Sequence, residues 1–175
     1  RLNQRSYYHM NQTEVEASVV NLTVIDNVTV TLNYVMDGTP VPQGTWAIVW
    51  GLDQRWYLFK NGRFHADNAS IDYRKVGHCS VTHGKPVLHA GEIGIGRNGE
   101  MIWANPKSGH YRPQPRHVKR FYQYLSDTKG LPQEAVMWLQ SGSYNMNETE
   151  WKALFAQLVE PNHALITETI DESRM

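Results

Sequence analysis

The sequence predicts an α+β domain in which a bent antiparallel sheet, or a partly closed β-barrel, precedes two to three C-terminal helices. Two observations support this fold class. Apolar and polar residues alternate in several short runs between residues 15 and 105, and breaker-rich turns separate these runs. After residue 113 the apolar period changes to about 3.6, which is typical of helices. Strands first and helices last is an α+β order.

The first runs predict one hairpin and two further strands. Residues 15–35 alternate, and Asp26 with Asn27 can close a tight turn in the middle. The runs "TWAIVW" and "RWYLFK" follow, joined by "GLDQ", and predict two further strands. Their tryptophans are best explained as core residues.

Three more strands are expected over residues 76–82, 87–96 and 101–105, after an irregular stretch over residues 64–75. Asn98 and Gly99 between the last two are the strongest hairpin signal, because both residue types accept the positive φ of a type I′ turn. The four residues "HGKP" are the expected turn between the first two of these strands.

Helices are expected at the C-terminal end. Pro115 can open a helix whose apolar face carries Val118, Phe121, Tyr122 and Leu125. The run "QEAVMWLQ" predicts a short second helix, and Asn147 followed by Glu150 resembles the capping box of a third. Residues 1–14 are expected to form a flexible arm, and residues 162–175 a polar tail.

Length and charge limit the classes of function. The chain has 175 residues, which suits a single domain, and 17 basic residues balance 17 acidic ones. This balance argues against a general nucleic-acid binder. No apolar run is long enough to cross a bilayer, and a single cysteine excludes an internal disulfide.

Five N-x-S/T triplets indicate a secreted glycoprotein. They begin at Asn11, Asn21, Asn27, Asn68 and Asn147. Asn and Thr also suit turns and exposed strand faces, so each triplet has a local alternative explanation. The expected localisation is secreted.

Residues 77–95 hold the candidate site. On a strand, His78 and Ser80 share a face, and a turn at "HGKP" would place Ser80 opposite His89 and His78 opposite Gly91. A register shift of one residue would instead pair Cys79 with His89. Turn chemistry alone does not decide between the two registers.

Two enzymatic hypotheses follow from the two registers. In the first, His78 and Ser80 hold the riboses of NAD, Tyr111 stacks on nicotinamide, and Glu92, or with less reason Glu100, stabilises the oxocarbenium-like transition state of ADP-ribosyl transfer. In a large class of ADP-ribosyltransferases a strand His and a nearby hydroxyl have this role. The substrate would be a protein or a small molecule.

In the second hypothesis Cys79 is a nucleophile and His89 its base, as in a protein deamidase or hydrolase. A metal site of His78, His83, His89 and His110 ranks lowest, since no pair has metal-ligand spacing, and no metal is predicted. A non-enzymatic glycan- or protein-binding module remains a third possibility. A purely structural sheet explains the polar residues equally well.

Residues 56–125, about two-fifths of the chain, resemble a domain of plant IQ-motif calmodulin-binding proteins and of uncharacterised bacterial and fungal proteins, including secreted polymorphic toxins. The family segments "HSS", "AGE" and "SGHY-P" match these positions: His78, Ser80, Ala90, Gly91, Ser108, Gly109, His110, Tyr111 and Pro113. The resemblance implies a secreted, toxin-like effector. Calmodulin binding does not carry over, because the chain lacks a basic amphipathic helix of the IQ kind.

Two departures from the family pattern bear on the chemistry. The family has serine at the position of Cys79, which weakens the thiol hypothesis, and "HADNASIDYRKV" widens the spacing before His78.

The segment "SGHYRP" predicts a stiff corner that holds His110 and Tyr111, because Pro113 favours an extended Arg112.

Overall fold

The computed structural model describes residues 7–26, 29–60, 75–105, 107–108, 111–113, 115–130 and Thr149. Its elements, in chain order, are α1 (Gln12–Ala17), β1 (Val19–Ile25), β2 (Thr29–Tyr34), β3 (Gly44–Gly51), β4 (Trp56–Phe59), α2 (His78–Thr82), β5 (Val87–Ile95), β6 (Met101–Asn105) and α3 (Pro115–Lys129). The expected second and third C-terminal helices and the polar tail lie outside the described residues, apart from Thr149.

The six strands form one antiparallel sheet with the order β2-β1-β4-β3-β5-β6. The sheet curls like half a barrel, so that its two edges meet at one end. There the Leu32 amide donates to the carbonyl oxygen of Gly99 at 3.0 Å, and Thr31 bridges to Glu100. The predicted α+β class with a curled sheet is confirmed.

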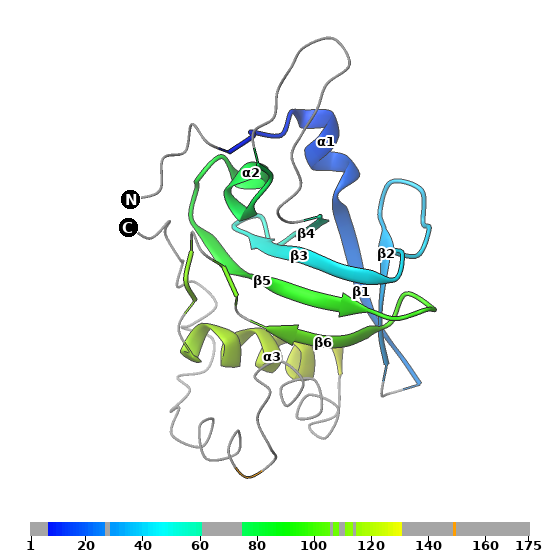
Figure 1. Cartoon of the computed structure of the whole chain (residues 1–175). Helices are drawn as coiled ribbons and strands as arrows, with labels where there is room; N and C mark the ends of the chain where they lie inside the picture. Colours follow the sequence, from blue (N-terminus) through cyan, green and yellow to red (C-terminus); the bar gives the residue numbers. More distant parts are fainter. Residues whose placement is uncertain are drawn as a thin grey trace.

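The sheet has an apolar core on each face. The helices α2 and α3 lie on opposite sides of the sheet (Figure 1). The α3-face core draws residues from all six strands and buries Phe121 and Leu125 of α3, which confirms the helix predicted from Pro115. The α2-face core includes Val81 of α2 and Met10 of the N-terminal segment. The tryptophans of β3 and β4 are buried, as expected.

Residues 7–14 belong to the packed domain, which corrects the expected flexible arm. Tyr7 forms a bridge to Lys75, and the Met10 amide donates to the carbonyl oxygen of Ser80 at 2.9 Å. Asn11 then caps α1 with a complete capping box that involves Glu14. This capping signal was overlooked because the segment has no apolar period. Residues 1–6 are outside the described part of the chain.

The predicted strand over residues 76–82 is wrong, because this segment forms α2. Gly77 is the N-cap of α2 and has an extended backbone. The Gly77 amide donates a hydrogen bond to the Ser80 hydroxyl at 2.9 Å. His83 closes the helix in a left-handed conformation with φ 56°. The alternation of polar side chains is too short to distinguish a strand from a single helical turn.

The hairpin between β5 and β6 is confirmed, but its predicted turn type is not. Of residues 97–100, Gly99 alone has a positive φ, at 79°. A type I′ turn would need Asn98 to have one as well. Instead the Asn98 amide donates to a carboxylate oxygen of Glu100 at 2.7 Å, which stabilises a different turn.

Candidate functional site

His78 joins α2 to the sheet. Its side chain is 4% exposed, and Nε2 donates to the carbonyl oxygen of Gly91 on β5 at 2.7 Å. The ring also meets Phe59 edge-on, with 6.1 Å between ring centroids. His78 therefore does lie beside Gly91, as the strand pairing implied, but the contact is a buried link from a helix to a strand.

Ser80 and Cys79 are completely buried, each with 0% exposure. The Ser80 hydroxyl accepts the Gly77 amide and so helps to cap α2. Because this hydroxyl and the His78 ring belong to a buried helix, the expected open clamp of an imidazole and a hydroxyl is not formed by the described residues.

His89 packs toward α3. Its ring stacks on Phe121 with 4.7 Å between centroids and 5° between ring planes. Neither ring nitrogen has a hydrogen-bond partner in the described part of the chain, so the alternative thiol–imidazole pair with Cys79 is not formed either. Burial lowers the pKa of His89 to about 3, and the charges of Arg120, His78 and His117 act in the same direction.

A variant with phenylalanine at His89 is expected to be less sensitive to acid. The pKa of His89 is lowered from 6.5 to about 3 in the folded chain, so the unfolded chain binds one more proton between these values. The free energy of unfolding should therefore fall by up to about 1.4 kcal/mol for each pH unit on descending through this window.

Urea unfolding at a series of pH values measures this slope. His89→Phe should flatten it relative to the parent. An identical slope for the parent and His89→Phe would show that the buried ring does not resist protonation.

Tyr111 fixes the end of α2 to the start of β5. The ring is 2% exposed, and its hydroxyl donates to the carbonyl oxygen of Lys85 at 2.7 Å and accepts from Thr82 at 2.6 Å. The Tyr111 amide donates to the Ser108 hydroxyl at 3.2 Å. With its hydroxyl satisfied and its ring buried, Tyr111 does not present a stacking face to solvent.

The corner before α3 differs from its prediction. Arg112 has φ 47°, in the left-handed region, instead of the extended form expected before Pro113. Its amide donates to the carbonyl oxygen of Ser108 at 2.9 Å, and this tight turn outweighs the preference that proline imposes. Gly109 and His110 lie outside the described residues, so their predicted roles stay predictions.

The two candidate carboxylates lie apart from this cluster. Glu92 on β5 is half-buried and accepts from the Asn105 side-chain amide at 3.3 Å. Glu100 lies in the β5–β6 turn, where it accepts the Asn98 amide. Neither has a hydrogen bond or an ion pair to His78 or Ser80. Within the described ranges, no three His, Cys, Asp or Glu side chains are grouped so that they could hold a metal ion.

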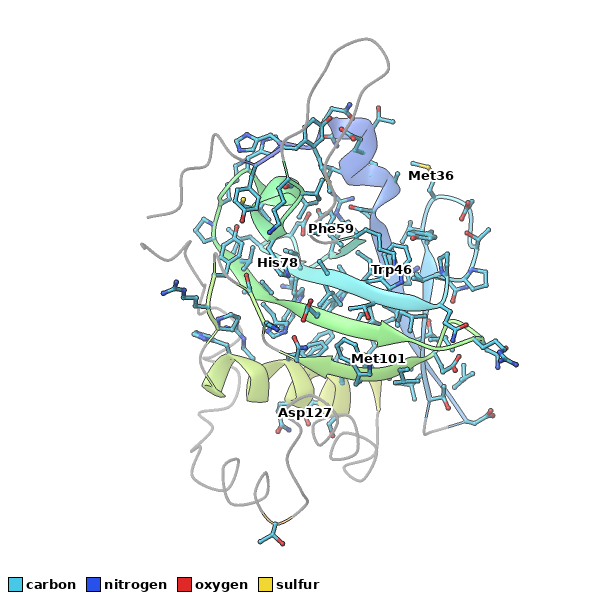
Figure 2. All side chains as sticks on the ribbon, viewed as in Figure 1. Met36, Trp46, Phe59, His78, Met101 and Asp127 are labelled. Atoms are coloured by element: carbon cyan, nitrogen blue, oxygen red, sulfur yellow. The ribbon has the colours of Figure 1, made fainter. Side chains whose placement is uncertain are left out.

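One hollow lies elsewhere, beside β1, and is called the β1 groove below. It has a volume of about 390 Å³ and is lined by these residues: Glu16, Val19, Val20, Asn21, Leu22, Val35, Met36, Gln54, Arg55, Trp56, Tyr124 and Lys129. A second hollow of about 430 Å³ shares Met36 and extends to Met10 and Phe59. Figure 2 shows Met36 at the outer margin of the molecule, well separated from His78.

A charged network forms one wall of the β1 groove. Arg55 donates to Glu16 at 3.1 Å and to Asp53 at 2.9 Å, and hydrogen bonds to these two carboxylates raise the pKa of Arg55. Burial and the hydrogen bond to Asp53 raise the pKa of Tyr57 to about 12. Arg55 is thus compensated by two carboxylates, and this wall offers little net positive charge to an anionic ligand.

Sequence reasoning missed the β1 groove because its lining comes from elements far apart along the chain. One signal was present: the run "VVNLTVI" of β1 contains no charged residue and no proline.

Comparison with known proteins adds no relative. No protein-family model, no curated protein and no solved structure matches the chain. The resemblance of residues 56–125 to the "SGHY-P" domain stays a prediction. None of the helices in the described ranges combines the length and apolarity that a bilayer crossing requires.

Proposed function

We propose that this protein is a binding module that recognises a partner protein through the β1 groove. The observation that carries the proposal is an open groove with apolar residues at its margin. Val35 and Met36 are 51% and 62% exposed at this margin. Exposed apolar side chains beside a hollow mark interaction sites more often than isolated ones do, and methionine adapts to varied partners.

The enzymatic hypotheses have less geometric support. His78, Ser80 and Tyr111 line neither the β1 groove nor the neighbouring hollow, and all three are buried. A dinucleotide would have to displace the hydrogen bonds that these residues make within the domain. ADP-ribosyl transfer with NAD and Cys79–His89 hydrolysis stay predictions, and release of nicotinamide from NAD by the full chain would revive the first.

A protein segment fits the β1 groove better than a glycan does. Sugar rings stack on exposed aromatic faces, but Trp56 is buried and one of its faces is covered by Trp50, 4.8 Å away with 8° between planes. Tyr124 packs against both rings. The groove therefore presents aliphatic and amide groups in place of a free aromatic platform.

Secretion remains part of the proposal. Asn11 and Asn21 are exposed and accessible to N-glycosylation, whereas the other three triplets begin outside the described residues. Because Asn21 lines the β1 groove, a glycan there would obstruct it. If the chain is produced in the secretory pathway and still binds its partner, Asn21 should therefore carry no glycan. Peptide mass mapping measures this, and a glycan found at Asn21 in the binding-competent protein would contradict the proposal.

Met36→Glu is expected to weaken peptide binding about tenfold or more, because it places a charge at the apolar margin of the β1 groove. The probes are peptides selected from a random displayed library on the full chain, and calorimetry measures their dissociation constants. Ile102→Glu is the matched control, since Ile102 is also an exposed apolar residue but does not line the groove. Equal weakening by both variants, or by neither, would contradict the proposal.

A further inference from the structure

β1 has an incomplete partner on one side. It pairs with β2 along nearly its whole length, from Val20↔Tyr34 to Ile25↔Thr29. Its pairing with β4 covers only Val19 and Val20. From Asn21 to Ile25, therefore, one edge of β1 has no strand beside it in the described part of the chain, and the start of this edge lines the β1 groove.

The backbone groups that point to this open edge can be assigned. The carbonyl oxygen of Ser18 accepts the Leu58 amide at 2.8 Å, so Ser18 directs its backbone groups to the β4 side. In an antiparallel ladder these groups alternate between the two edges. The N–H and C=O groups of Leu22 and Val24 therefore point to the open edge.

The open edge lacks the features by which natural proteins block strand pairing. Such edges usually carry lysine, proline or a β-bulge. β1 has no charged residue or proline, and its pairing with β2 runs without a register shift. Ile25 at its end is 43% exposed. An uninterrupted, uncharged edge is a template for an additional strand.

The opposite wall restricts what can enter. Gln54 and Arg55, in the turn before β4, face β1 across the groove. A slot between a strand edge and a turn suits a single extended chain, which can present its backbone groups to β1. Arg55 is compensated by Glu16 and Asp53, so the occupant needs no particular charge there.

Side-chain alternation along β1 indicates the pattern of the occupant. Leu22 is buried and Val24 packs against the α3-face core, whereas the side chains of Asn21 and Thr23 are exposed. A strand added beside them continues the same two faces of the sheet. Apolar residues at every second position would extend the core, and polar residues between them would face solvent.

We infer that the β1 groove binds an extended segment of a partner protein by strand addition, with backbone hydrogen bonds to Leu22 and Val24 and alternating apolar side chains turned toward Trp56 and Tyr124. This inference rests on the proposed function, because it specifies how the same groove holds its partner. Affinity would come from the backbone and from apolar contact, so the recognised pattern is the alternation and not one fixed sequence.

Amide hydrogen exchange of the full chain tests strand addition directly. In the free protein the amides of Leu22 and Val24 should exchange quickly, whereas that of Thr23, which faces β2, should exchange slowly. Saturation with a library-selected peptide should slow Leu22 and Val24 at least about tenfold. If both amides are already slow in the free chain, the edge is occupied and the inference fails.

Modified peptides and a charge variant sharpen the test. N-methylation of the alternate peptide amides that face β1 should weaken binding about tenfold, while N-methylation of the other set should not. Ile25→Lys should weaken binding more than Ile102→Lys. Suppose that selected peptides bind the parent chain, that this binding is lost in Met36→Glu, and that the amides of Leu22 and Val24 still exchange quickly in the complex. This result would keep the proposed function and overturn strand addition. Failure to select any peptide would count against both, and a dimer lost with Ile25→Lys would favour a second copy as occupant.

Discussion

Replacing Gly91 with alanine is expected to destabilise the fold by about 3 kcal/mol or more. A Cβ atom at Gly91 would lie 1.9 Å from the carbonyl oxygen of Asn105, a backbone atom on the neighbouring strand β6. The two strands would have to separate where Glu92 pairs with Asn105. The same shift would disturb the Gly91 carbonyl group that accepts from His78.

Gly94→Ala is the matched control on the same strand. A Cβ atom there would also be too close to a neighbour, at 2.1 Å, but that neighbour is the side chain of Trp103, which is half-exposed and can rotate away. We expect a loss of about 1 kcal/mol or less. Urea unfolding of both variants measures the difference, and equal losses would contradict the close approach at Gly91.

His78→Ala is expected to lower the free energy of unfolding by about 3 kcal/mol. The substitution leaves the buried Gly91 carbonyl without its partner and opens a cavity beside Phe59. His78→Gln offers a side-chain N–H donor in its place and should recover part of this stability. Recovery by glutamine, measured by chemical unfolding, identifies the hydrogen bond as the cause; no loss in either variant would show that the link is dispensable.

Together these predictions give the "HCS" and "AGE" segments a structural explanation. Gly91 is needed for the close approach of two strands, and His78 attaches α2 to one of them. Polar residues in such positions resemble a catalytic motif in the sequence because they are few, closely spaced and chemically versatile. Because these residues are buried in the structure, the structural explanation is favoured over the catalytic one.

The sequence predicted the sheet better than the site, for physical reasons. The alternation over β1 and β2 and the hairpins between β3 and β4 and between β5 and β6 depend on local signals, and they are confirmed. The amphipathic period of α3 is also local. α2 has only five residues, and its helical form depends on the Ser80 cap and on burial against β3 and β5, which a short polar pattern does not reveal.

The β1 groove was not predictable from spacing. It forms because β4 is shorter than β1 and because the turn at Arg55 and the end of α3 come close to β1. Each of these facts concerns the arrangement of strands, which depends on contacts between distant residues. The uncharged run of β1 became informative only when its missing neighbour was known.

The central claim is that the β1 groove, and not the buried histidine motif, carries the function. Calorimetric titration of a library-selected peptide into His78→Gln and Met36→Glu tests this most directly. The account predicts that folded His78→Gln binds like the parent, whereas Met36→Glu keeps its stability and binds about tenfold or more weakly. The opposite pattern, with binding lost in folded His78→Gln and retained in Met36→Glu, would contradict it.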